Sequence, residues 1–352
     1  MKKRSDKKTE QSEVVSRPFY KRLGKFMLIF LSTLLVIWLL VQLITTIIFF
    51  EFFKKADKEF RTPGMSDGLV SQGFTYLEDQ QFYLQCGYMA DGESASRIYI
   101  IPKNEPDEAY YVELKNADGS PYLGHTGGIA AKGNFVWLAN DGEGEDNCVW
   151  VLSMYDLLRL DAGEAYTLDV SFKPKTRAAY CFVDGNALWV GEFYRPVDYP
   201  TDESHTFTVS GGKEHHALIG YYTIDETAET GIASTTPVVF LSVPEHVQGA
   251  ERDQYGHFIL STSYGLSKSH LLFYDDVLTD KNDAYLTVDG QEVPVWFLDD
   301  DALKRDLICP PMSEEIVINN DRVYYLTESA SKKYIFGKFI RSRHVYSLPI
   351  EH

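Results

Sequence analysis

The chain has 352 residues, 44% of them hydrophobic and 14% aromatic, and a formal net charge of −17 at pH 7. Beyond its first 25 residues, 25 Lys and Arg face 48 Asp and Glu, so most of the protein is acidic and would repel nucleic acid. Frequent Tyr and Phe in short runs favour β structure, and four cysteines without a C-x-x-C spacing argue against a zinc cluster or redox motif.

The N-terminal part is predicted to anchor the protein in a lipid bilayer. Residues 26–50 contain no charge, Gly or Pro, and as a helix they would reach about 37 Å, enough for a hydrocarbon core of about 30 Å. Residues 1–25 carry nine Lys or Arg against three acids, which places this arm in the cytoplasm. No small-residue cleavage site follows the apolar run, so we expect an uncleaved, single-pass signal anchor in a bacterial cell membrane.

Residues 51–69 begin as a charged helical continuation and lose their pattern at Thr62-Pro63-Gly64, so we expect a stalk there. The remaining residues, 70–352, form one extracytoplasmic domain in this interpretation. They contain a theme that is clearest at residues 125–140, written HTGGIAAKGNFVWLAN. Val136 and Leu138 fall on one face of a strand and Trp137 on the other, and Gly133-Asn134 supplies a tight turn, which together predict a β-hairpin buried on both sides.

Looser copies of this hairpin recur along the chain. Their turns are expected at residues 78–80, 133–134, 184–186, 255–256 and 319–321. About 50 to 70 residues separate consecutive turns and contain further strand candidates, so each unit has about four strands. Such a repeat is typical of a β-propeller. We therefore predict an all-β fold, a five-bladed β-propeller after a single transmembrane helix. Six blades would result if the long third unit hides a degenerate one, and a β-sandwich is the alternative fold.

Polar residues flank the five turns at matching distances and define two candidate rings at one mouth of the channel. Before the turns these residues are Gln72, His125, Arg177, Gln248 and Glu314, with Glu315 adjacent to the last. After the turns they are Tyr88, Asn140, Glu192, Ser263 and Glu328. Strand interiors between them are apolar, so packing alone does not account for the polar ends. A one-residue slip in register would turn these side chains away from the channel.

The chemistry of the rings suggests three kinds of role. Asn140, Glu192 and Glu328 supply hard oxygen ligands for a divalent cation, Ca²⁺ or Mg²⁺. His125 and Glu314 are the candidate catalytic residues, because converging carboxyls repel and raise a pKa toward the range useful for proton transfer. The candidate ligand-binding residues are Gln72, His125, Arg177, Gln248, Ser263 and Glu314.

Several motifs together resemble a group of secreted or membrane-anchored bacterial β-propeller proteins. They are G-H-T-G-G-I-A at 124–130, V-Q-G at 247–249, S-T-S-Y-G at 261–265, P-P-M-S-E-E at 310–315 and T-E-S-A at 327–330. The acidic mouth is more distantly similar to gluconolactonase and regucalcin-like propellers. That resemblance implies Glu, Asn and Asp around one divalent metal, with an Asp as general base, and here Asn140 with Glu192, Glu314 or Glu328 would take the ligand parts. No Asp stands at a ring position here, and six blades are usual in that family.

Two functional hypotheses follow. The first is a membrane-anchored binding or scaffolding module for a cell-envelope glycan, peptide or protein. The second is a divalent-metal-dependent hydrolase or lyase, lactonase-like, with its site at the channel mouth. The chain has no G-x-S-x-G, H-E-x-x-H, P-loop or dinucleotide motif, so the common serine hydrolase, zinc protease and nucleotide-binding classes lose support.

Overall fold

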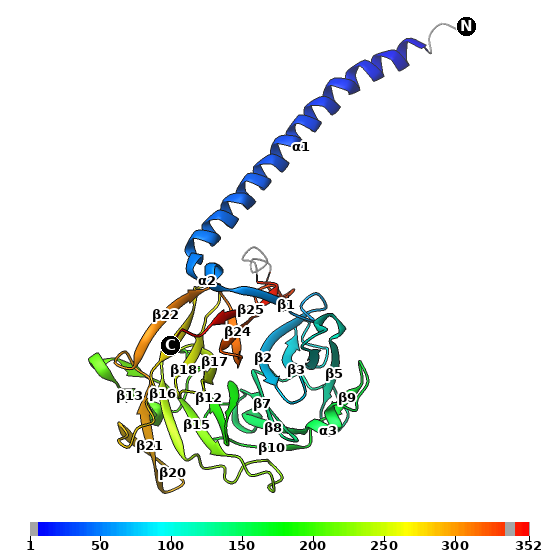
Figure 1. Ribbon diagram of the computed structural model, residues 1–352. Coiled ribbons are helices and arrows are strands. Elements are labelled where there is room, and N and C mark those ends of the chain that lie inside the picture. Colours follow the sequence, from blue (N-terminus) through cyan, green and yellow to red (C-terminus); the bar gives the residue numbers. More distant parts are fainter. Residues whose placement is uncertain (1–5, 335–341, 352) are drawn as a thin grey trace. The chain divides into compact units, whose positions relative to one another are not determined.

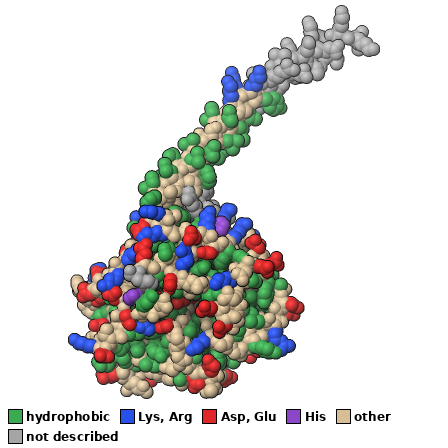
Figure 2. All heavy atoms as spheres, in the orientation of Figure 1, with side chains coloured by type: hydrophobic (Ala, Val, Ile, Leu, Met, Phe, Trp, Pro, Cys, Tyr) green, Lys and Arg blue, Asp and Glu red, His purple; other side chains and the backbone are tan. Residues whose placement is uncertain are grey.

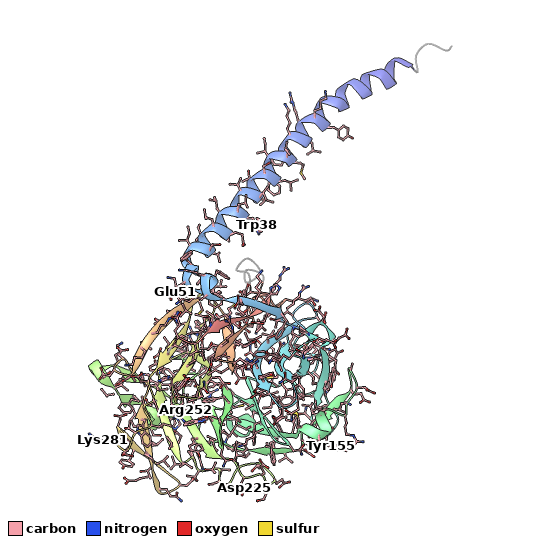
Figure 3. All side chains as sticks on the ribbon, in the orientation of Figure 1. Trp38, Glu51, Tyr155, Asp225, Arg252 and Lys281 are labelled. Carbon is pink, nitrogen blue, oxygen red and sulfur yellow. The ribbon has the colours of Figure 1, made fainter. Side chains whose placement is uncertain are left out.

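A computed structural model describes residues 6–334 and 342–351. The chain divides into two compact units, of which the first ends at Ile48 and the second begins at Phe49. The first unit is the helix α1 (Asp6–Ile48), which contains an apolar stretch, Tyr20–Ile48, with a mean hydropathy of 2.6. Hydrophobic side chains cover it (Figure 2), and Trp38 projects from its middle (Figure 3). By length and composition this helix could span a membrane.

The second unit is a five-bladed β-propeller, as the hairpin repeat predicts (Figure 1). Each blade begins at the channel with an inner strand: β2 (Leu69–Leu77), β6 (Gly128–Lys132), β11 (Tyr180–Asp184), β17 (Val247–Arg252) and β23 (Ser313–Asn319). Each inner strand contacts the next, and β23 contacts β2, so the ring is closed. The second strands follow after the predicted turns: β3 (Phe82–Met89), β7 (Phe135–Asn140), β12 (Ala187–Gly191), β18 (Phe258–Thr262) and β24 (Arg322–Thr327).

The outer strands depart from simple chain order. Blade one continues with β4 (Arg97–Pro102), β5 (Tyr110–Lys115) and β9 (Ala165–Thr167), and blade two with β8 (Cys148–Ser153) and β10 (Val170–Phe172). Blade three continues with β15 (Ala217–Thr223), β16 (Val239–Val243), β21 (Gln291–Phe297) and β20 (Ala284–Val288). Blade four continues with β19 (Ser269–Tyr274) and β22 (Leu303–Cys309). The β20–β21 hairpin therefore leaves blade four and joins blade three, through a parallel pairing of β21 with β16.

Short elements decorate the blades without adding to the ring. They are α3 (Met154–Leu157), η1 (Pro106–Glu108), η2 (Gly144–Asp146), η3 (Glu203–His205), η4 (Ser210–Gly212), β13 (Phe207–Thr208) and β14 (Glu214–His215). In the stretch after β8 only Met154–Leu157 is helical, as α3, and a turn at residues 300–302 leads into β22.

Blade five is closed by the N-terminal part of the unit. Its last strands are β25 (His344–Pro349) and β1 (Asp57–Arg61), which pair antiparallel. Before β1, the short helix α2 (Phe50–Lys55) packs Phe52 into the interface between blades four and five, 5.1 Å from the ring centre of Tyr325. Residues 51–61, which the sequence pattern assigned to a stalk, thus belong to the propeller. The apolar helix ends at Ile48 rather than at the predicted residue 50.

The core is divided among the interfaces between neighbouring blades. The strand β7 shows how: Val136 and Leu138 pack toward blade one, while Trp137 and Ala139 pack toward blade three. This is the two-faced burial that the alternating pattern predicts. The four cysteines are buried free thiols, and buried thiols of this kind pack as small hydrophobic residues.

The axis of the propeller is tied together by Glu315 of β23. Its carboxylate oxygens accept backbone N–H groups from Phe74 (2.6 Å), Ile129 (3.0 Å) and Cys181 (3.2 Å), which belong to the inner strands of blades one, two and three. Gly128 allows this approach, since a Cβ at that position would lie 2.8 Å from a Glu315 oxygen. One buried side chain therefore links four of the five blades.

Candidate functional site

The inner strands bend where they reach the mouth of the channel. Pairing with the second strand shifts register between Ser71 and Phe74 in β2, between Val247 and Gly249 in β17, and between Ser313 and Ile316 in β23. Such bulges redirect side chains. The residues inside them are Gln72-Gly73, Gln248 and Glu314-Glu315, which the sequence placed in the first ring.

The mouth contains a cavity of about 540 Å³, within the range of small-ligand sites. Its lining combines aromatic rings, amides and carboxyls. The lining residues are Gln72, Tyr88, His125, Asp141, Ala179, Phe193, Tyr199, Gln248, Ser263, Tyr264, Gly265, Met312, Glu314, Glu328, Lys333 and Tyr334. The predicted ring members Gln72, Tyr88, His125, Gln248, Ser263, Glu314 and Glu328 thus come together around one space.

Glu314 and Glu328 form a carboxyl pair on neighbouring strands of blade five. Glu314 is 2% exposed, and Glu328 is 9% exposed at the end of β24. Burial raises the pKa of Glu328 to about 7, although Tyr334, Lys333 and Gln72 favour its ionised form. Burial and the nearby Glu328 and Glu315 raise the pKa of Glu314 well above its ordinary range. Both carboxyls are therefore protonated more readily than an exposed glutamate.

This pair predicts that the propeller loses stability as pH rises. Each folded-state pKa exceeds its unfolded value, so the folded protein holds protons that the unfolded chain releases from about pH 4.5 upward. For Glu328 alone, raised from 4.5 to about 7, the loss is about 3 kcal/mol, because one pKa unit corresponds to about 1.4 kcal/mol. Urea unfolding at pH 5 and pH 8 should show this fall. The double variant Glu314→Gln/Glu328→Gln should show a flatter profile, and an equal slope in both proteins would contradict the assignment.

Two tyrosines and a lysine form the rim of the cavity beside the pair. Lys333 Nζ lies 4.7 Å from the ring centre of Tyr88 and 5.5 Å from that of Tyr334. His125 stacks on the same Tyr88, with ring centres 4.9 Å apart. Gln72 Nε2 donates to Glu328 Oε2 at 3.0 Å, which fixes the carboxyl toward the rim.

Another part of the lining is aromatic and comes from the loops between the second and third strands of blades three and four. Phe193 and Tyr199 meet edge to face with ring centres 5.2 Å apart. The guanidinium of Arg195 packs over the ring of Tyr264, 4.0 Å from the ring centre. Thr126, His246 and Met312, each just before an inner strand, have positive φ values of 49°, 65° and 64°. Strained backbone of this kind is often found next to functional sites.

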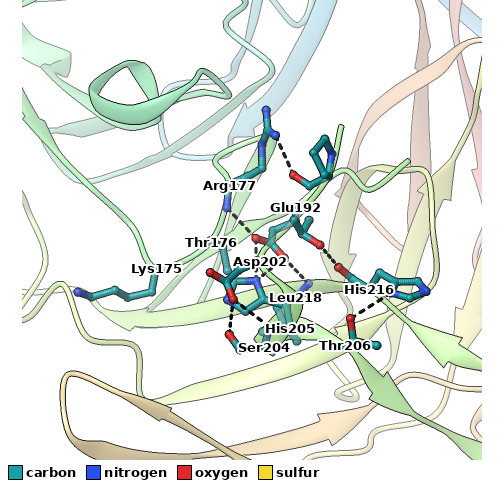
Figure 4. Close-up of polar contacts among 12 residues, drawn as sticks. Lys175, Thr176, Arg177, Glu192, Asp202, Ser204, His205, Thr206, His216 and Leu218 are labelled. Atoms are coloured by element: carbon teal, nitrogen blue, oxygen red, sulfur yellow. Dashed lines mark hydrogen bonds and ion pairs between the residues drawn. The ribbon is translucent and has the colours of Figure 1, made fainter. Parts of the chain in front are cut away.

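Glu192 does not line this cavity. Its carboxylate accepts N–H groups from Arg177 and Leu218, both at 2.9 Å, and lies 3.0 Å from His205 Nδ1 (Figure 4). Although burial opposes it, this contact raises the pKa of His205. Glu192 therefore ties the long loop between β12 and β15 of blade three to the propeller.

Arg177 and Asn140 are likewise engaged in structural contacts and lie outside the lining. The Nε of Arg177 donates to Asp141 at 2.7 Å, and its Nη1 donates to the carbonyl of Pro200. Asn140 accepts the His125 N–H and donates to the Asp146 carbonyl. Of the three predicted metal ligands, only Glu328 lies at the cavity. Within residues 6–334 and 342–351, no group of three or more His, Cys, Asp or Glu is arranged to hold a metal ion. A Ca²⁺ or Mg²⁺ role stays a prediction.

Sequence reasoning missed several lining residues. Asp141 and Tyr264 each follow a predicted ring position by one residue, so a wider window would have included them. Lys333 and Tyr334 lie in the connection from β24 to β25, six or seven residues after the end of β24 and therefore outside the ring positions. No repeat signal points to them.

No family model and no curated protein matches the sequence. Among solved structures, the glutaminyl cyclase of Myxococcus xanthus is similar at 9% identity and a TM-score of 0.41, covering 83% of this chain and 94% of that one. The PQQ-bound aldose sugar dehydrogenase of Streptomyces coelicolor gives 12% and 0.45, covering 83% and 95%. BamB of Moraxella catarrhalis gives 7% and 0.33, covering 80% and 85%. Likenesses of this order identify neither a family nor an activity. The fold and the cavity define the class of protein: it is a five-bladed β-propeller with a polar and aromatic cavity at the mouth of its channel.

Proposed function

We propose that the protein is a membrane-anchored binding module whose channel mouth takes a hydroxyl-rich ligand of the cell envelope, such as a saccharide. The proposal includes insertion of α1 in the bilayer, with the basic arm in the cytoplasm and the propeller outside. That orientation rests on the excess of Lys and Arg before the apolar stretch.

One observation carries the proposal: aromatic faces and amide groups surround the same cavity. Tyr88, Phe193, Tyr264 and Tyr334 line the cavity with aromatic carbon that suits the C–H groups of a sugar ring, although Tyr88 also stacks on His125 and Tyr264 on His246. Gln72 and Gln248 offer both donors and acceptors for hydroxyl groups. A volume of about 540 Å³ has room for a small saccharide.

The test is a calorimetric titration of the full chain in detergent micelles with a panel of short envelope saccharides. For a ligand that binds, Tyr264→Ala should weaken binding about tenfold, since an aromatic contact of this kind contributes about 1 kcal/mol. Tyr285→Ala is the matched control, because Tyr285 is 59% exposed on β20, away from the cavity lining. Failure of the whole panel, or equal loss in both variants, would count against the proposal.

A hydrolase or lyase at the same mouth is the second candidate, favoured by the carboxyl pair. Glu314 and Glu328 lie in one cavity with raised pKa values, as a proton donor and acceptor would require. His125 lies in the same lining. Chromatography of the bound saccharides after incubation separates the two functions: intact ligand supports a binding module, and cleaved ligand supports an enzyme.

A further inference from the structure

Three buried glutamates near the channel differ in how their carboxyls are satisfied. Glu315 accepts three backbone N–H groups, and Glu192 accepts two as well as contacting His205. Glu314, only 2% exposed, receives no hydrogen bond from any residue in the described ranges. Buried polar groups are almost always paired. Glu315 and Glu192 therefore serve the fold, whereas the carboxyl of Glu314 is bonded by none of the residues that the structure describes.

The Glu314 carboxyl, which no described residue bonds, belongs to the wall of the cavity. Glu314 is part of the lining, together with Glu328 on the neighbouring strand. The charged groups acting on Glu314 are Glu328, Glu315 and Lys333, of which only Lys333 is positive. The remaining titratable lining groups are Tyr88, His125, Tyr199, Tyr264, Tyr334 and Asp141. Asp141 is already paired with Arg177.

The rim shows that these aromatic rings suit a positive charge. The Lys333 ammonium sits over Tyr88 and Tyr334 and donates a hydrogen bond to the Tyr88 hydroxyl. Aromatic faces attract ammonium groups through their quadrupole. A ligand ammonium placed further in, among the same rings, would meet the two carboxyls as well.

We propose that the ligand of the channel mouth carries a cationic amino group. Glu314 and Glu328 bind this group, and Tyr88 and Tyr334 at the rim surround it. This inference rests on the proposed function and specifies the ligand class. An amine supplies both the counter-charge and the hydrogen-bond donors that Glu314 lacks. It also explains why two carboxyls, which are costly to bury, stand together in the wall of one cavity.

The test uses choline and ethanolamine as cationic probes and 3,3-dimethylbutan-1-ol as the neutral isostere of choline, titrated into the full chain in detergent micelles. We expect at least one cation to bind at least tenfold more tightly than the isostere. Affinity for choline, whose charge is fixed, should rise from pH 6 to pH 8 as the pair loses its proton. Glu314→Gln and Glu328→Gln should each weaken binding at least tenfold, while Glu226→Gln, at an exposed site away from the lining, should not.

The outcomes separate this inference from the proposed function. If a neutral saccharide binds and neither cation competes with it, the inference is wrong and the proposed function stands. If no saccharide and no cation binds, both are wrong. If Ca²⁺ or Mg²⁺ binds more tightly than either amine and Glu314→Gln abolishes that binding, the carboxyls hold a metal and the inference is overturned.

Discussion

Replacing Glu315 by alanine should lower the free energy of unfolding by about 3–5 kcal/mol. The variant removes the acceptor of three buried N–H groups, and each unpaired buried donor costs about 1–3 kcal/mol. The effect exceeds that of an ordinary surface substitution because the three donors belong to three different blades. Urea unfolding of the full chain in detergent, followed by circular dichroism, measures it.

The adjacent residue provides the matched control. Glu314→Ala removes a carboxyl of the same kind, equally buried, that no described residue bonds. It should leave stability within about 1 kcal/mol of wild type or raise it, because an unsatisfied buried carboxyl is itself destabilising. A larger loss in Glu314→Ala than in Glu315→Ala would reverse the roles assigned to the two residues.

Phe52→Ala should destabilise the propeller by about 3–5 kcal/mol, the usual cost of deleting a buried aromatic side chain. Phe52 is fully buried against Tyr325 and Tyr346, with ring centres 5.1 and 5.6 Å away. The same unfolding experiment applies. Phe50→Ala, at a residue that is 60% exposed two positions earlier, should change little.

This pair of variants tests where the propeller begins. If α2 and β1 were only a stalk, both substitutions would be nearly neutral. The structure instead fastens this segment to blades four and five, with Arg305 paired to Glu51 and Lys55 paired to Glu351. Loss of stability in Phe52→Ala alone is the expected result.

The hairpins were predictable because their signals are local. Turns such as Asp184-Gly185-Asn186 stand between alternating runs, and all five lie where the sequence places them. The pairing of the outer strands was harder to predict. The pairings of β9 with β5 and of β21 with β16 are parallel and join distant segments. β1, at the start of the propeller, pairs with β25, its last strand. Nothing in a short window of sequence encodes such contacts.

The candidate site was also predicted only in part from the sequence. In blades one, four and five, bulges in the inner strands turn the ring residues Gln72, Gln248 and Glu314 into the mouth, and His125 of blade two lines the cavity without such a bulge. In blades two and three the loops that follow fold over the strand ends, and Asn140 and Glu192 are used to hold those loops. The sequence shows a polar residue in each place but not whether a loop satisfies it.

The most direct test of the account is one titration: choline and its neutral isostere against wild type and Glu314→Gln, with Glu226→Gln as the charge control. The account predicts binding of choline by wild type and by Glu226→Gln, at least tenfold weaker binding by Glu314→Gln, and little or no binding of the isostere. Equal binding of choline by all three proteins would show that Glu314 does not face a ligand, and would contradict the role assigned to the channel mouth.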